Sequence, residues 1–420
     1  MTSPDSEELP VQYEDIERAR ERIDDDTVVK ETPVEQSTSL GEFVGGDVYL
    51  KMEHLQWTGS FKTRGAYNKI VQDVERGVEE FVAASAGNHA QGVALAATRC
   101  GADSTIFMPE NAPQTKIDAT RGYGATVELV GQDFQKTMAH AKEVVQDRDA
   151  EFVHAYDDTD IIAGQGTLGT EMYHDHPNVE TVVVPIGGGG LISGISTAIK
   201  HLSPETRVVG VQATGAETVH KSLDKGIPVT LDEVDTIADG IATGGISEAT
   251  LRIIQANVDE VVTVSDTEIA RAILLLMERA KQVVEGAGAA SVAAILSDDL
   301  DVSGETVMPL LCGGNLDMTQ LQTVLVHALT ERQQLLRLRV RITDRPGVLE
   351  EISGVIADFK ANIHDVRHDR SVEDLEVGEA YIVFDVETSG AEHAGNIVDA
   401  IRDHGYEVDV VNHTASDRRV

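Results

Sequence analysis

The stretch Thr181–Lys200, TVVVPIGGGGLISGISTAIK, decides how the rest of the chain is interpreted. TVVVPI is short, rich in β-branched residues and typical of a buried strand, and LISGISTAIK is interpreted as the helix that follows it. Four consecutive glycines, from Gly187 to Gly190, join the two. Consecutive glycines let the backbone approach a ligand and turn several N–H groups toward it. The stretch therefore predicts a strand, a phosphate-binding loop and a helix, with a merely flexible loop as the alternative.

The same alternation of strand and helix continues from about residue 47 onward. Seven segments are short, apolar and bounded by turn residues: DVYLKME, FVAASA, STIFMP, TVELV, EFVHAY, TVVVPI and RVVGVQA. The segments between them, such as FKTRGAYNKIVQDVERG and DFQKTMAHAKEVVQDRD, space apolar residues three and four positions apart. This order predicts an α/β fold with a mostly parallel sheet and helices on both faces. Ligands in such folds bind beyond the carboxyl ends of the strands.

The pattern changes near residue 331, at the polar stretch TERQQ (330–334). LRLRVRI alternates as a strand, RPGVLEEISGVIADF is helical, and ANIHDVRHDR and EAYIVFDVET are extended. A helix over AEHAGNIVDAIRDHG and a final strand over YEVDVVN complete the order βαββαβ. That order predicts a separate ferredoxin-like domain at the C-terminal end.

The composition narrows the class of protein. The 420 residues include 34 basic and 72 acidic ones, and the formal net charge is −38. This argues against non-specific binding to nucleic acid or anionic membranes. No apolar run is long enough to span a bilayer, and the acidic N-terminus does not resemble a signal peptide, so we expect a cytoplasmic protein. Because the acidic residues are dispersed, they suggest adaptation to molar salt; an ordinary acidic cytosolic protein is the alternative.

Two further loops follow predicted strands and carry reactive side chains. In Gly59–Gly65, Lys62 stands at a helix start, where the helix dipole favours an uncharged and therefore nucleophilic amine; an ordinary surface lysine is the alternative. In the turn Ser85–Gln91, Asn88 could cap the next helix, and the exposed N–H groups could hold a carboxylate. His89, taken alone, is expected to be structural.

In combination, these loops resemble a known family. The ordered motifs SFKTRGA (60–66), SAGNHAQG (85–92), GGGGL (187–191) and CGGN (312–315) are similar to those of pyridoxal-phosphate enzymes with the tryptophan-synthase β-subunit fold. They are most similar to the threonine/serine dehydratase branch, and DRPGVL (344–349) resembles an ACT domain. The resemblance implies a fold-type II catalytic domain over 1–330, made of two open, twisted, mostly parallel sheets flanked by helices, with a smaller subdomain inserted at about 52–157. A linker (331–335), an ACT domain (336–413) and a tail (414–420) would follow.

The resemblance also implies roles for individual residues. Lys62 would form the Schiff base with pyridoxal 5′-phosphate, Phe61 would lie against the ring, and Asn88 would hydrogen-bond the phenolic oxygen of the cofactor. The phosphate would be held by Gly187, Gly188, Gly189, Gly190 and Leu191, and Cys312 would face the pyridine nitrogen. The substrate carboxylate would be bound by the turn that contains Ser85, Ala86, Gly87, Asn88, His89 and Gln91.

The implied reaction is deamination of L-threonine to 2-oxobutanoate and ammonia, with L-serine as a second substrate. A β-replacement or threonine-synthase-like enzyme and an inert amino-acid-binding protein are the alternatives. Related racemases have a serine where this chain has Ala86, so racemisation is disfavoured. Some relatives bind a divalent cation where this chain has Gln212, Ala216 and Thr218; a neutral amide is a poor ligand for such a cation, and we expect no metal.

The ACT-like domain suggests regulation by an amino acid, and isoleucine is the natural effector to expect for an enzyme that consumes threonine. The implied effector site contains Asp344, Arg345, Pro346, Gly347 and Asn362, and it could be shared between two subunits of a homodimer or homotetramer. The alternative is that this domain serves only to assemble the oligomer.

Overall fold

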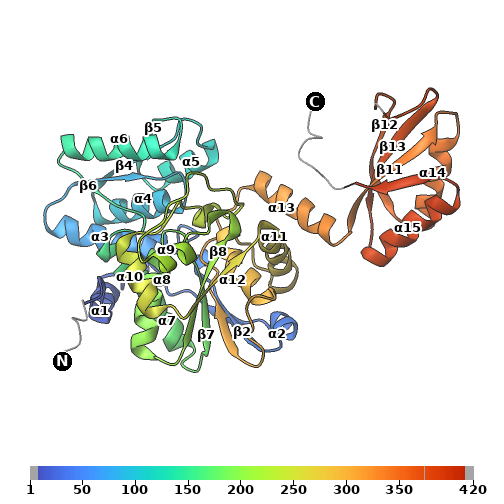
Figure 1. Ribbon diagram of the computed structural model, residues 1–420. Helices are drawn as coiled ribbons and strands as arrows, with labels where there is room; N and C mark the ends of the chain where they lie inside the picture. The colour runs from blue at the N-terminus through green and yellow to red at the C-terminus, as the bar shows by residue number, and fades with distance from the viewer. Residues whose placement is uncertain (1–7, 373, 412–420) are drawn as a thin grey trace. The chain divides into compact units, whose positions relative to one another are not determined.

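The computed structural model describes residues 8–372 and 374–411 (Figure 1). The chain divides into two compact units, of which the first ends at Leu316 and the second begins at Asp317. The sequence placed this boundary later, at a linker over 331–335. The difference arises because helix α13 (Met318–Glu331) packs against the first strand of the second unit and groups with it. The predicted tail, 414–420, lies outside the described residues.

The larger sheet of the first unit has six strands and is parallel except at one edge. The short edge strand pairs antiparallel with its neighbour, and every other pairing in the sheet is parallel. In sheet order the strands are β1 (Val34–Gln36), β2 (Asp47–Lys51), β10 (Thr306–Pro309), β7 (Thr181–Pro185), β8 (Arg207–Ala213) and β9 (Glu260–Val264). All five residues of β7 are buried, as expected for a central parallel strand covered on both faces.

The helices around this sheet pack through small and aliphatic residues. Helix α8 packs closely on α7 and α10, while α12 packs on α11 and on strands β7 to β9. The helices are α1 (Tyr13–Arg22), α2 (Thr38–Val44), α7 (Thr159–Asp175), α8 (Gly190–Leu202), α9 (Val219–Lys225), α10 (Glu248–Asn257), α11 (Asp266–Leu275) and α12 (Gly286–Leu296). Helix α8 begins directly at the glycine loop, as the sequence predicted.

The smaller sheet of the first unit is wholly parallel. Its order is β5 (Thr126–Leu129), β4 (Asp103–Met108), β3 (Glu80–Ala84) and β6 (Glu151–Phe152). Alternate residues of β3 enter two different apolar cores. One contains residues of α3 (Lys62–Glu75), α4 (Asn88–Cys100) and α5 (Gln114–Gly122), and the other contains residues of α6 (Phe134–Asp147). Both faces of this sheet are therefore covered, which confirms the two mostly parallel sheets flanked by helices.

The second unit is a four-stranded antiparallel sheet with helices on one face. Its order is β12 (Asn362–Asp369), β13 (Glu379–Glu387), β11 (Leu335–Thr343) and β14 (Glu407–Val410). Helices α14 (Val348–Asp358) and α15 (Ala391–Asp403) pack on alternate β11 residues from Leu336 to Ile342. The predicted βαββαβ order is confirmed.

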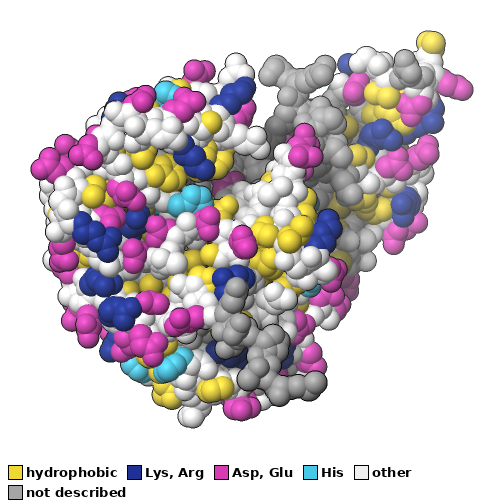
Figure 2. Space-filling view, turned by 60° about the vertical axis from the view of Figure 1, so that its left-hand side comes forward, with side chains coloured by type: hydrophobic (Ala, Val, Ile, Leu, Met, Phe, Trp, Pro, Cys, Tyr) yellow, Lys and Arg dark blue, Asp and Glu magenta, His cyan; other side chains and the backbone are white. Residues whose placement is uncertain are grey.

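The described surface agrees with the dispersed charge of the sequence. Figure 2 shows Asp and Glu side chains scattered over the visible face instead of gathered in one patch. No helix among residues 8–372 and 374–411 is long and apolar enough to cross a membrane.

Candidate active site

A cavity lies at the carboxyl end of β7, where the fold predicts a ligand site. It brings together the Lys62 loop, the glycine loop and Cys312, which are far apart in the sequence. Its lining residues are Phe61, Lys62, Ala155, Tyr156, Pro185, Gly187, Gly188, Gly189, Gly190, Leu191, Gly240, Ile241, Thr243 and Cys312. All the residues predicted to touch the cofactor, except Asn88, belong to this set.

The glycine loop has the geometry of an anion cradle. Gly189 has a φ of 89° and precedes the first residue of α8, so the unpaired N–H groups at the start of that helix lie beside the cavity. A Cβ atom on Gly188 would lie 2.2 Å from the Tyr156 ring, which excludes a side chain there. Thr250 donates a hydrogen bond from Oγ1 to the Gly188 carbonyl oxygen over 3.0 Å and fixes the loop.

Lys62 begins α3, as predicted, and its amine faces the cavity. Its Nζ donates to the Ala155 carbonyl oxygen over 3.1 Å and lies 5.0 Å from the centre of the Phe61 ring. Burial lowers the pKa of Lys62 to about 8, although the neighbouring acidic groups Cys312 and Glu285 favour the protonated form. The amine is therefore far more often neutral near pH 7 than an ordinary lysine, as a nucleophile or base requires.

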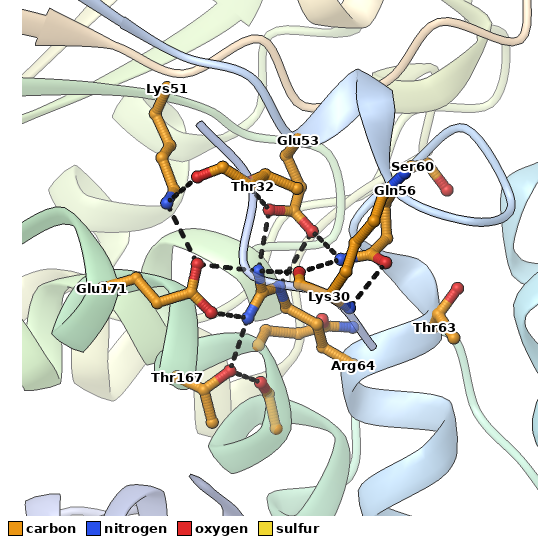
Figure 3. Close-up of polar contacts among 12 residues, drawn as sticks. Lys30, Thr32, Lys51, Glu53, Gln56, Ser60, Thr63, Arg64, Thr167 and Glu171 are labelled. Carbon is orange, nitrogen blue, oxygen red and sulfur yellow. Dashed lines mark hydrogen bonds and ion pairs between the residues drawn. The ribbon is translucent and has the colours of Figure 1, made fainter. Parts of the chain in front are cut away.

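The helix that carries Lys62 is anchored by a buried network of charges (Figure 3). Arg64, in the first turn of α3 and fully buried, donates from Nε and Nη2 to the two carboxylate oxygens of Glu53 over 2.8 and 3.0 Å. It also donates to both carboxylate oxygens of Glu171 in α7 over 2.5 and 3.0 Å. Lys51, also fully buried, lies 3.0 Å from Glu171 and 2.8 Å from Asp175. This network ties the first turn of α3 to α7 and to the segment after β2.

Cys312 follows β10 and is buried at the cavity wall, with 3% of its surface exposed. Burial, reinforced by the nearby Glu285 carboxyl, raises the pKa of the thiol well above its usual value. A neutral thiol at this position offers a weak hydrogen-bonding group and no negative charge.

The turn Ser85–Gln91 differs from its prediction in one respect. Helix α4 begins at Asn88 itself, its N-cap is Gly87, and no side chain caps it. Asn88 does not cap the helix because its amide is engaged elsewhere: Nδ2 donates to Glu285 Oε1 over 2.7 Å, and Oδ1 accepts from Asn315 Nδ2 over 2.8 Å. Ser85 Oγ accepts the Gly87 N–H over 3.2 Å and closes the turn.

His89 is in the core of the smaller subdomain. Its Nε2 lies 2.8 Å from the Val153 carbonyl oxygen, and only 5% of the residue is exposed. Burial, with the nearby Lys62 amine, lowers the pKa of His89 to about 3, so the ring is neutral at physiological pH. Gln91 is likewise buried in α4, while Ser85, Ala86 and Gly87 are half-buried.

Tyr156 is a lining residue that the sequence interpretation missed, because EFVHAY was assigned to a strand. Strand β6 ends at Phe152, since the backbone N–H groups of Tyr156 and Asp157 turn back to donate to His154 Nδ1 over 3.3 and 2.9 Å. The turn brings Ala155 and Tyr156 against Lys62 and the glycine loop. Their place beyond the carboxyl end of a strand is the signal that could have identified them.

At the position where some relatives bind a cation, Gln212 is buried and hydrogen-bonded within the chain. Its Oε1 accepts the N–H groups of Thr218 and Val219 over 3.0 and 2.8 Å, and its Nε2 donates to the Ala216 carbonyl oxygen over 3.2 Å. Within the described ranges, no group of three or more His, Cys, Asp or Glu side chains could hold a metal ion.

In the second unit, the predicted effector residues fall into two places. Asn362 pairs with Glu387 in the sheet, whereas the loop Asp344–Gly347 follows Thr343, which pairs with Glu379 at the other end of the same strand. The Asp344 carboxylate accepts from Arg370 Nε over 2.6 Å. Asn362 lines a separate open pocket between α14 and α15, together with Phe359, Lys360, Glu387, Thr388, Ser389 and His393. A single chain does not bring these two places together.

The sequence matches the pyridoxal-phosphate dependent enzyme family over residues 26–313, which is more than half of the chain. The chain belongs to this family of pyridoxal-phosphate enzymes. Residues 336–416 match the ACT domain. Among the curated relatives of this chain, an L-threonine ammonia-lyase of Thermotoga maritima is 44% identical to it over 405 residues. The match covers 96% of this chain and all of that protein.

Solved structures of a threonine deaminase and a serine racemase are similar to most of the chain. The processed form of threonine deaminase isoform 2 from Solanum lycopersicum has a TM-score of 0.73 and 35% identity, covering 78% of this chain and 95% of the other. Maize serine racemase has a TM-score of 0.72 and 33% identity, covering 77% of this chain and all of the other. These matches confirm the fold-type II assignment.

The residues around the cavity fit pyridoxal phosphate. A lysine amine of lowered pKa suits attachment to an aldehyde, and the glycine loop excludes side chains from the place where a phosphate would approach the start of α8. Cys312 supplies a neutral group at the cavity wall. Pyridoxal phosphate is therefore the cofactor of this protein, and the sequence identified it.

Proposed function

We propose that this chain is a threonine ammonia-lyase that converts L-threonine to 2-oxobutanoate and ammonia. The observation that carries the proposal is the end-to-end match with the L-threonine ammonia-lyase of T. maritima, which includes both the catalytic unit and the ACT domain. Intact Lys62, Asn88 and glycine loop support an active enzyme over an inert binding protein.

The cofactor, when bound, supplies an electron sink for the electron pair that remains at Cα of the substrate after deprotonation. Lys62 would hold the cofactor and then, once the substrate amino group replaces it, take the Cα proton as a base. Loss of the β-hydroxyl as water and later addition of water release ammonia and the 2-oxo acid. Cys312 cannot place a negative charge at the ring, which favours rapid elimination over prolonged storage of that electron pair.

The turn Ser85–Gln91 would bind the substrate carboxylate through its N–H groups. Ala86 has no exchangeable proton on its side chain, so nothing at that position can return a proton to the opposite face of Cα. This favours deamination over the racemisation performed by the structurally similar maize serine racemase. One methyl group changes binding by only about 1–3 kcal/mol, so L-serine should also react.

The activity is tested by initial rates of 2-oxo acid release from L-threonine and L-serine with added pyridoxal phosphate. We expect faster turnover of threonine, with 2-oxobutanoate as the product. The assay is run in molar potassium chloride and repeated at low salt, because the dispersed acidic surface is proposed to suit a cytoplasm of high ionic strength. If neither substrate released a 2-oxo acid, the proposed reaction would be overturned.

For the ACT domain we propose feedback by isoleucine at a site shared between two chains, within a homodimer or homotetramer. Its support is that Asn362 and the loop Asp344–Gly347 lie at opposite ends of the sheet, so two chains are needed to combine them. Isoleucine should raise the threonine concentration needed for half-maximal rate, and Asn362→Ala should lose that response while keeping the rate without effector. Saturating isoleucine that leaves the threonine dependence unchanged would contradict the feedback.

A further inference from the structure

The side-chain amide of Asn88 is held from both sides by residues of other elements. Glu285, the N-cap of α12, accepts from Nδ2, and Asn315, in the loop after β10, donates to Oδ1. If the amide were rotated by half a turn, its oxygen would face the Glu285 carboxyl and its NH₂ would face the Asn315 NH₂. The contact with Asn315 would be lost, and so would the contact with an ionised Glu285, so the orientation seen here is the favoured one.

Asn315 is itself fixed to the loop that carries the catalytic lysine. Its Nδ2 donates to the Thr58 carbonyl oxygen over 2.6 Å as well as to Asn88. The close approach of Glu285 and Asn88 depends on the residue next to Cys312: a Cβ atom on Gly313 would lie 2.3 Å from Glu285 Oε1 and 3.2 Å from Asn88 Nδ2. A side chain at position 313 would therefore push these two groups apart.

Glu285 remains an acceptor over the physiological pH range. Only 8% of the residue is exposed, and burial raises its pKa to about 7, against the lowering effect of the Asn88 hydrogen bond. Whether the carboxyl is protonated or ionised, it retains an oxygen that accepts from Asn88. The amide nitrogen of Asn88 carries two hydrogens, and Glu285 needs only one of them.

We propose that Glu285 and Asn315 are positioning residues that hold the Asn88 amide with its second N–H directed at the phenolic oxygen of bound pyridoxal phosphate. The proposal rests on the contact with the phenolic oxygen that the family resemblance implies for Asn88, but not on the identity of the substrate. Without these two partners the amide could present its oxygen to the phenolic oxygen, and two acceptors would repel each other.

The test is equilibrium dialysis of holoenzyme against graded pyridoxal phosphate, with the absorption band of the bound cofactor recorded for each variant. We expect Asn315→Ala and Glu285→Leu to weaken cofactor binding about 10-fold or more, as loss of a hydrogen bond to a charged group does, and to shift the band. Glu285→Gln keeps an acceptor oxygen and should restore both. Asn88→Ala is the reference for complete loss, and Asn257→Ala, which removes a hydrogen bond to Thr197 outside the cavity lining, is the control.

Wild-type cofactor affinity and an unshifted band in Asn315→Ala and Glu285→Leu would overturn the proposal, provided that Asn88→Ala changes both. Equal losses in Glu285→Gln and Glu285→Leu would also overturn it, because the acceptor would then not be what matters. If Asn315→Ala does not fold, the comparison of the two Glu285 variants decides alone. An unchanged Asn88→Ala would overturn this proposal together with the Asn88 contact, whatever the substrate proves to be.

Discussion

Two sets of buried ionisable groups lie next to each other in the catalytic unit, and they differ in how their charges are compensated. Arg64 is matched by Glu53 and Glu171: burial alone would lower the pKa of Arg64, but the two carboxylates outweigh it and raise it. Around the cavity, Lys62 and Glu285 form no ion pair with a described residue, and burial moves their pKa values to about 8 and about 7.

The difference separates groups that support the site from groups that can do its chemistry. A buried charge with partners stays charged and holds elements together. A buried group without them moves toward its neutral form, which is the form that can act as nucleophile or base near pH 7. Lys62 and Arg64 are two residues apart in the same helical turn, yet they belong to opposite sets.

The largest effect should come from Lys62→Ala. Removing the amine takes away both the attachment point of the cofactor and the base, so turnover should fall by at least about 10³-fold. The far-ultraviolet circular dichroism should stay as in the wild type, because Lys62 contributes no ion pair to the core. A variant that still deaminates threonine at an appreciable rate would place Lys62 outside the chemistry.

Next in size is Arg64→Met, which leaves Glu53 buried without its partner. The free energy of unfolding should fall by about 3–5 kcal/mol, measured by urea denaturation. The matched control is Arg18→Met, which removes an exposed ion pair with Asp15 and should cost at most about 1 kcal/mol. Similar losses in both variants would show that the compensated network does not have the anchoring role assigned to it.

A smaller effect concerns pH. Only the neutral amine attacks an aldehyde, so the rate of cofactor uptake by the cofactor-free protein should rise about tenfold per pH unit below 8 and level off above it, following the lowered pKa of Lys62. Stopped-flow absorbance measures this rate, with Nα-acetyl-lysine, which keeps a free side-chain amine, in solution as the reference. A rate that keeps rising up to pH 10, as the reference should, would contradict the lowered pKa.

The smallest effect is expected for Cys312→Ser. A hydroxyl replaces the thiol with another neutral group of similar size, so the catalytic barrier should change by less than about 1.5 kcal/mol. Steady-state rates with threonine measure it. Cys312→Asp provides the contrast, because a carboxylate would favour a protonated cofactor ring. If the catalytic barrier changed more in Cys312→Ser than in Cys312→Asp, a neutral group at position 312 would not be what matters.

Much of this arrangement could be predicted from sequence, for reasons that are local. The glycine loop follows strand β7 directly and the Lys62 loop comes after β2, so the rule that sites lie at carboxyl ends locates them. Cys312 was identified only through the family resemblance. The network of Arg64, Glu53, Lys51 and Glu171 could not be predicted, because Glu171 lies more than a hundred residues along the chain from the other three. The grouping of α13 with the second unit could not be predicted, because the polar stretch at 331 suggested a linker and the sequence of the preceding helix does not show which strand it packs against.

The central claim is that the uncompensated lysine, and not one of the buried paired lysines near it, holds the cofactor. Borohydride reduction of the holoenzyme makes the bond between cofactor and protein permanent, and peptide mapping by mass spectrometry then locates it. We predict a single pyridoxyl group on Lys62. A label on Lys51 or Lys69, both of which are buried in ion pairs, or no label at all, would contradict the assignment.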